Sequence, residues 1–142
     1  MSGIIGGAGS KSGVIGTTEL DYEEGSWTPV NTTYSMSHAD GKYIKIGNKV
    51  QLWGKLQFDS SVSNSNAWSG LPFNSASDPT SKGVGGTCNW TGIDIGGTTL
   101  SPRIVNETTW HWFSASDNGT WTDQFNVVSS DQLQFTIVYY TA

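Results

Sequence analysis

Three side chains in this sequence could act as a nucleophile or a general base: Cys88, His38 and His111. Neither histidine stands at ligand-like spacing from other metal-binding residues, and no motif surrounds Cys88. A lone cysteine is most often a small buried thiol. His111 lies between Trp110 and Trp112, so in a strand it would point away from both rings. The spacing predicts no catalytic, metal or cofactor site, and a Cys–His pair brought together by folding is the alternative that it leaves open.

Two polar segments have a partial likeness to ligand-binding loops. A phosphate-binding loop that ends at residues 11–12 would need glycine where the sequence has Ile5 and Ser10. Residues 117–119, Asp-Asn-Gly, and the nearby Asp123 could bind calcium, but their spacing departs from that of an EF-hand loop. Asp-Asn-Gly is first of all typical of a turn. Neither segment is therefore predicted to bind a cofactor or a metal.

The tryptophans are the strongest candidates for a functional role. Trp110 and Trp112 share one face of an expected strand, and Trp121 follows after one turn. Aromatic faces stack on sugars and on flat partner surfaces, and they also fill cores and subunit interfaces. We expect the core or interface role for this group. Trp53 differs, because it falls on the polar face of an expected strand, where an exposed ring contributes nothing to folding. Its position there predicts a contact between Trp53 and a neighbouring chain.

The elements that carry these residues are predicted to be strands. Apolar and polar residues alternate without a break over residues 50–58, with Gly54 on the apolar face, and again over residues 132–140. A turn is expected at residues 47–48, and residues 26–34 carry a proline typical of an edge strand. Further strands are expected over residues 43–46, 83–90, 100–106 and 108–114, and a polar loop is expected over residues 59–70. This spacing predicts a β-sandwich or jelly roll.

The composition excludes several classes of function. The 142 residues include 18 Gly and seven Trp, only 13% are charged, and the formal net charge is −5. Nucleic-acid binding is disfavoured because it needs concentrated positive charge and the basic residues are scattered. No apolar run approaches the roughly 20 residues of a membrane span. The first residues lack the pattern of a signal peptide, so synthesis in a cytoplasm is expected.

The chain is expected to begin with an extended arm. Residues 3–16, GIIGGAGSKSGVIG, contain too few apolar side chains to fold alone. Because glycine lets one backbone approach another closely, this segment is predicted to anchor the protein to a partner surface. The arm and an acidic connector, ELDYEEG, would fill residues 1–25, and a single β-sandwich domain residues 26–142. The side chains expected to hold the partner are Ile4, Ile5, Val14 and Ile15.

Two stretches carry a resemblance to a known class of proteins. The head SGIIGGAGSKSGVIG, followed by TTELDYEEGSWTP, resembles a segment of tailed-phage virion structural proteins, where it precedes β domains of tail-fibre, receptor-binding or structural proteins. The stretch YIKIGNKVQLWGKLQF, followed by GLPF, resembles a recurrent element of those domains. Together they cover residues 2–29 and 43–73. The resemblance implies a homotrimer with β-rich domains on a virion.

These observations predict a non-enzymatic protein of the virion surface, made in the host cytoplasm and attached to other capsid or tail proteins. Tail fibres are usually much longer than this chain, so a trimeric capsid decoration (cement) protein or a short fibre is favoured. A receptor-binding domain of a tail fibre, with a host surface glycan as partner, is the alternative. The competing class is a carbohydrate-binding module that would use Trp110, Trp112 and Trp121.

Overall fold

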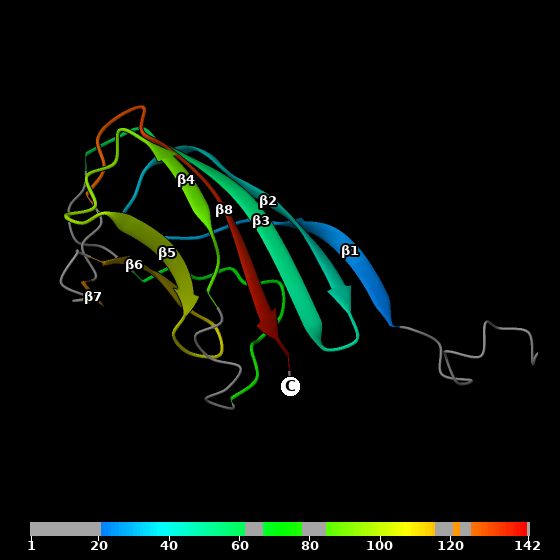
Figure 1. Cartoon of the computed structure of the whole chain (residues 1–142). Helices are drawn as coiled ribbons and strands as arrows, with labels where there is room; N and C mark the ends of the chain where they lie inside the picture. The colour runs from blue at the N-terminus through cyan, green and yellow to red at the C-terminus, as the bar shows by residue number, and fades with distance from the viewer. Residues whose placement is uncertain (1–20, 62–66, 78–84, 116–120, 123–125, 142) are drawn as a thin grey trace, which may run out of the picture.

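The computed structural model describes residues 21–61, 67–77, 85–115, 121–122 and 126–141, which form two antiparallel β-sheets (Figure 1). The predicted all-β sandwich is confirmed. The described part of the chain has eight strands: β1 (Tyr22–Trp27), β2 (Met36–Ile46), β3 (Lys49–Phe58), β4 (Cys88–Thr91), β5 (Thr99–Ile104), β6 (Trp110–Ala115), β7 (Trp121–Thr122) and β8 (Gln132–Tyr140).

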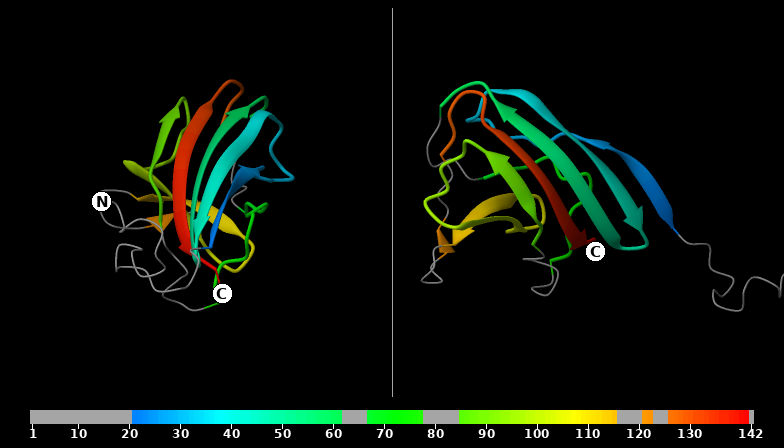
Figure 2. Two further views of the ribbon diagram at one scale, coloured as in Figure 1. Left: turned by 90° about the vertical axis from the view of Figure 1, so that its right-hand side faces the viewer. Right: turned by 45° about the horizontal axis from the view of Figure 1, so that its top comes forward.

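The larger sheet has the strand order β1-β2-β3-β8-β4, and the smaller sheet has the order β5-β6-β7. The smaller sheet lies under the β8 and β4 side of the larger sheet, and β1 forms the opposite edge (Figures 1 and 2). The last strand, β8, thus inserts between β3 and β4 and pairs with both. This insertion brings side chains from the two ends of the chain onto one sheet face.

The strongest strand predictions are confirmed by β3 and β8. Side chains along both strands alternate between the core and the opposite, outer face of the larger sheet. The hairpin before β3 has the expected two-residue turn, since Ile46 pairs with Lys49. Gly47 has a φ of +59°, the positive value that a type II′ turn needs at its first central position.

A row of two glycines and two aromatic residues crosses the larger sheet. Trp27, Gly41, Gly54 and Phe135 are successive cross-strand partners on β1, β2, β3 and β8. A Cβ on Gly54 would lie 2.8 Å from the Phe135 ring, so glycine leaves the space that this ring occupies. The Trp27 ring lies close to Gly41 and the Phe135 ring close to Gly54, and the two rings meet edge to face with their centroids 6.0 Å apart. The glycines therefore let two large rings pack directly on the sheet.

Two sequence predictions about loops are wrong. Residues 22–25 of the expected acidic connector form most of β1, so the expected boundary between residues 25 and 26 falls inside a strand. Trp68 lies within an expected polar loop but is fully buried, and its backbone pairs with that of Trp110 in both directions, at 2.9 and 3.0 Å. Pairing and burial with residues distant in sequence override the local polar composition in both places.

Candidate functional site

Trp110 and Trp112 are core residues and not ligand-binding residues. Both are 0% exposed, and their rings lie 5.2 and 5.1 Å from the ring of Phe135. The core interpretation is confirmed for this pair, and the proposal of an exposed aromatic cluster is wrong, because large apolar rings gain most from full burial. Trp121 belongs to β7, and its side chain lies outside the described part of the structure.

The cysteine and the histidines are not brought together by folding. Cys88 is partly buried and donates a hydrogen bond to the backbone oxygen of Leu100 at 3.0 Å; burial raises the pKa of its thiol to about 12. His38 lies on the outer face of the larger sheet, on β2, and two strands, β3 and β8, separate it from β4. His111 stacks on Phe113 with ring centroids 6.1 Å apart, on the half-buried face of β6 opposite to Trp110 and Trp112. The Cys–His alternative is therefore wrong for these residues.

The four apolar residues of the expected anchor, together with Asp117 and Asp123, lie outside the described residues. Within the described ranges, no three His, Cys, Asp or Glu side chains group closely enough to hold a metal ion. That part of the chain also contains no helix with the length and apolarity of a membrane span.

Trp53 lies on the outer face of the larger sheet and is 40% exposed, as its position on the polar side of β3 predicted. The core nevertheless positions it. The indole Nε1–H of Trp27 donates a hydrogen bond to the backbone oxygen of Trp53 at 3.1 Å, across Gly41. This bond joins the edge strand β1 to β3 and holds the backbone beneath the exposed ring. Contact of Trp53 with a neighbouring chain stays a prediction.

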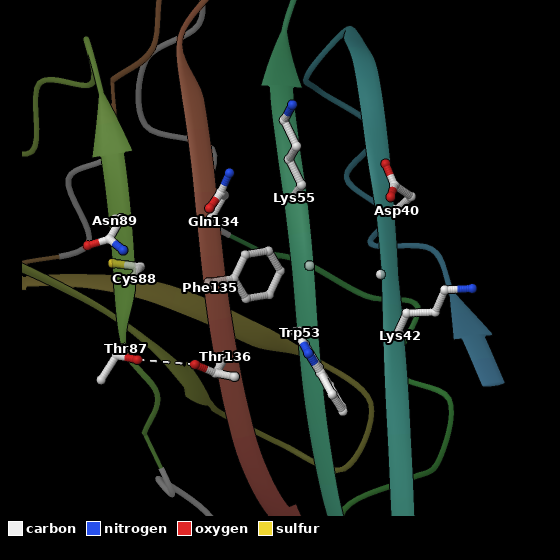
Figure 3. A pocket seen from close by; sticks show the side chains of 12 residues that line it. Asp40, Lys42, Trp53, Lys55, Thr87, Cys88, Asn89, Gln134, Phe135 and Thr136 are labelled. Atoms are coloured by element: carbon white, nitrogen blue, oxygen red, sulfur yellow. Dashed lines mark hydrogen bonds between the residues drawn. The ribbon is translucent and has the colours of Figure 1, made fainter. Parts of the chain in front are cut away.

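Beside Trp53, a shallow groove of about 470 Å³ runs across β2, β3, β8 and β4 (Figure 3). Its side chains come from two rows that run across the strands, and each row consists of residues paired on neighbouring strands. The two rows lie two residues apart along each strand, because every second residue of a strand faces the same side. The first row, the polar row, is Asp40, Lys55, Gln134 and Asn89. The second row is Lys42, Trp53, Thr136 and Thr87.

The floor between these rows is backbone, because Gly41 and Gly54 in the intervening row have no side chain and Phe135 and Cys88 face the core. At one end of the groove, Thr136 donates its backbone N–H to the oxygen of Thr87 at 2.9 Å, and the two hydroxyls lie 3.1 Å apart (Figure 3). This contact fixes β4 against β8. The groove is thus built on paired strands and not on loops.

A second feature of the same face is a cluster of exposed apolar side chains near the β2–β3 turn. Tyr22 pairs with Ile46, Ile46 with Lys49, and Lys49 with Tyr140, so these residues form one row across four strands. Tyr22, Ile46 and Tyr140 are 54%, 44% and 38% exposed. The half-buried Ile44 and Val138 fall in the next row toward Trp53. The apolar strip is defined as Tyr22, Ile44, Ile46, Val138 and Tyr140.

Sequence reasoning found Trp53 but neither the polar row nor the apolar strip. The sequence indicated part of these features, because the residues of β3 and β8 in these rows are the ones that alternate with the buried apolar residues of the two segments. Comparisons of the chain with protein-family models, with curated proteins and with solved structures found no match. The geometry of the outer face therefore carries the functional argument.

Proposed function

We propose that this protein is a non-enzymatic structural protein on the surface of a tailed-phage virion, either a trimeric capsid decoration protein or a short fibre. The resemblance of the head and of the YIKIGNKVQLWGKLQF stretch to virion proteins supports this proposal. In this proposal the protein is made in the host cytoplasm, its N-terminal arm attaches it to other virion proteins, and its β-sandwich contacts further copies of itself.

The observation that supports an assembly role best is the apolar strip. Monomeric proteins rarely expose contiguous apolar patches, and such patches usually mark contacts with another protein. Three large side chains of the strip are more than a third exposed in the single chain. Glu24 lies next to Ile44 at one side of the strip, and Lys49 lies within it, between Ile46 and Tyr140, so copies that meet there could pair opposite charges. A second copy of this chain is therefore the partner that we assign to the strip.

The position of the candidate catalytic groups supports a non-enzymatic role. Cys88 is kept protonated by burial at neutral pH, and it faces neither His38 nor His111. A nucleophile needs a base within hydrogen-bond reach to be activated.

Two measurements test the proposal. Light scattering on the purified chain is expected to give three times the mass of one chain, and Ile46→Asn is expected to lower that mass while leaving the fold intact. Electron microscopy of purified particles, labelled through a tag after Ala142, is expected to place the label on the capsid or tail surface. A monomer at high concentration would refute the trimer, and particles without label would refute the virion location.

A further inference from the structure

We propose that the groove beside Trp53 is a saccharide-binding site, in which the Trp53 ring stacks on a sugar and the polar row binds its hydroxyl groups. This inference adds a ligand to the structural role and does not depend on it. It assigns the site to residues other than Trp110 and Trp112, whose burial removes them from contact with any ligand.

The polar row supplies the mixed hydrogen bonding that a sugar needs. A sugar hydroxyl donates one hydrogen bond and accepts others, so it fits a row that alternates acceptors with donors. Asp40 offers acceptors only, Lys55 donors only, and the amides of Gln134 and Asn89 offer both. Adjacent strands lie about 4.8 Å apart, so neighbouring side chains of this row are spaced on the scale of a sugar ring.

These polar groups are available for a ligand. Asp40 and Lys55 are direct cross-strand neighbours of opposite charge, yet the described residues show no ion pair between them. Figure 3 shows the Lys55 side chain extending along β3 and away from the Asp40 carboxylate. Gln134 and Asn89 are both exposed, and their amides make no side-chain hydrogen bond within the described structure. A ligand would therefore not have to break protein contacts to bind this row.

Trp53 provides the apolar half of the site. Its ring borders the groove in the row next to the polar row (Figure 3). Ring faces pack well against the C–H face of a sugar. The hydrogen bond from Trp27 holds the Trp53 backbone, and β3 is paired on both sides, so little ordering is needed when a ligand binds.

The groove fits other ligand classes less well. Asp40, Lys42 and Lys55 together carry one excess positive charge, which is too little for a polyanion such as a nucleic acid. A peptide would bind a sheet most strongly by adding a strand at its edge. Most of the groove crosses β2, β3 and β8, whose backbone is already paired on both sides, and only one end of it reaches the edge strand β4. Of these ligand classes, a hydroxylated ring bound by side chains is the one that matches the residues of the groove.

The experiment uses the full chain and a panel of immobilised short oligosaccharides, both neutral and carboxylated, followed by calorimetric titration with the members that bind. Trp53→Ala is expected to weaken binding about tenfold or more, as loss of an aromatic anchor does. Gln134→Ala is expected to weaken it less. Trp90→Ala is the matched control: Trp90 is 37% exposed, close to the 40% of Trp53, but it lies in the row of the buried Leu133.

Light scattering of the same variants separates this proposal from the trimer. An unchanged mass for Trp53→Ala together with lost sugar binding supports the saccharide site, whatever the oligomeric state is. A lower mass for Trp53→Ala would assign the ring to contact between copies and overturn the saccharide site. Failure of the unmodified chain to bind any member of the panel at millimolar concentration would overturn it as well, as would equal binding by Trp53→Ala and the unmodified chain.

Discussion

Gly41→Ala is the substitution that tests the packing beneath the groove most directly. Gly41 lies inside β2, where alanine normally stabilises a strand relative to glycine by about 0.5–1 kcal/mol. Here the added Cβ would lie 2.3 Å from Nε1 of Trp27 and 2.3 Å from the backbone oxygen of Trp53. These two atoms are joined by the hydrogen bond that ties β1 to β3. The methyl group would therefore displace either the indole ring or the neighbouring strand.

The expected cost follows from these contacts. Overpacking a well-packed core typically costs about 1–3 kcal/mol. Loss of the indole hydrogen bond adds about 1 kcal/mol. After the gain from replacing glycine is subtracted, Gly41→Ala is expected to lower the free energy of unfolding by about 1–3.5 kcal/mol. For a chain of this size that corresponds to a fall in the melting temperature of roughly 3–14 °C.

Urea unfolding and thermal melting followed by tryptophan fluorescence measure this effect. Gly85→Ala is the matched control, because a Cβ there would meet only atoms at 3.4 and 3.7 Å, which is ordinary contact. Its unfolding free energy is expected to change by less than about 0.5 kcal/mol, as for most surface substitutions. A Gly41→Ala variant as stable as the unmodified protein, or more stable, would show that the Trp27 ring does not lie over Gly41.

Three further predictions follow. Deletion of residues 1–16 should leave the melting temperature of the β-sandwich nearly unchanged but abolish binding to particles that lack the protein; a truncated chain that unfolds, or that still binds, contradicts the anchor. Trp110→Ala should lower the unfolding free energy by about 3–5 kcal/mol in urea titrations, because it leaves a cavity at a fully buried site. Burial raises the pKa of the Cys88 thiol to about 12, so this thiol stays protonated in the folded protein at pH values where it ionises in the unfolded chain. Its contribution to stability is therefore present at neutral pH and is lost as the pH rises toward 12. Cys88→Ala should make urea stability fall less steeply over that alkaline range, and an unchanged slope would contradict the pKa shift.

The local pattern of the sequence was sufficient to predict the strands that matter most for the site. Strict alternation identified β3 and β8, and the phase of that alternation put Trp53 on the outer face. It also put Gly54 on the inner face, where the Phe135 ring packs. These predictions succeed because the side-chain period of a strand is a local property, which depends only on which face is buried.

Tertiary structure decided the features that depend on which strands are neighbours. Trp68 looked like part of a polar loop, and only its pairing with Trp110 makes it a core residue. Local composition carries little information about such contacts, because they join segments far apart in the chain. The same reason explains why residues 22–25, which read as a solvated acidic connector, form an edge strand against β2.

The candidate site shows most clearly which features the sequence predicted and which depended on the tertiary structure. The sequence by itself determined that Trp53, Lys55 and Gln134 would point outward from their strands. Only the insertion of β8 between β3 and β4, and the register of those pairings, aligned Asp40, Lys55, Gln134 and Asn89 in one row beside the Trp53 ring. A shift of one residue in any of these pairings would turn part of that row into the core. The register depends on the packing of both sheets together, so no single segment of the sequence could specify the groove.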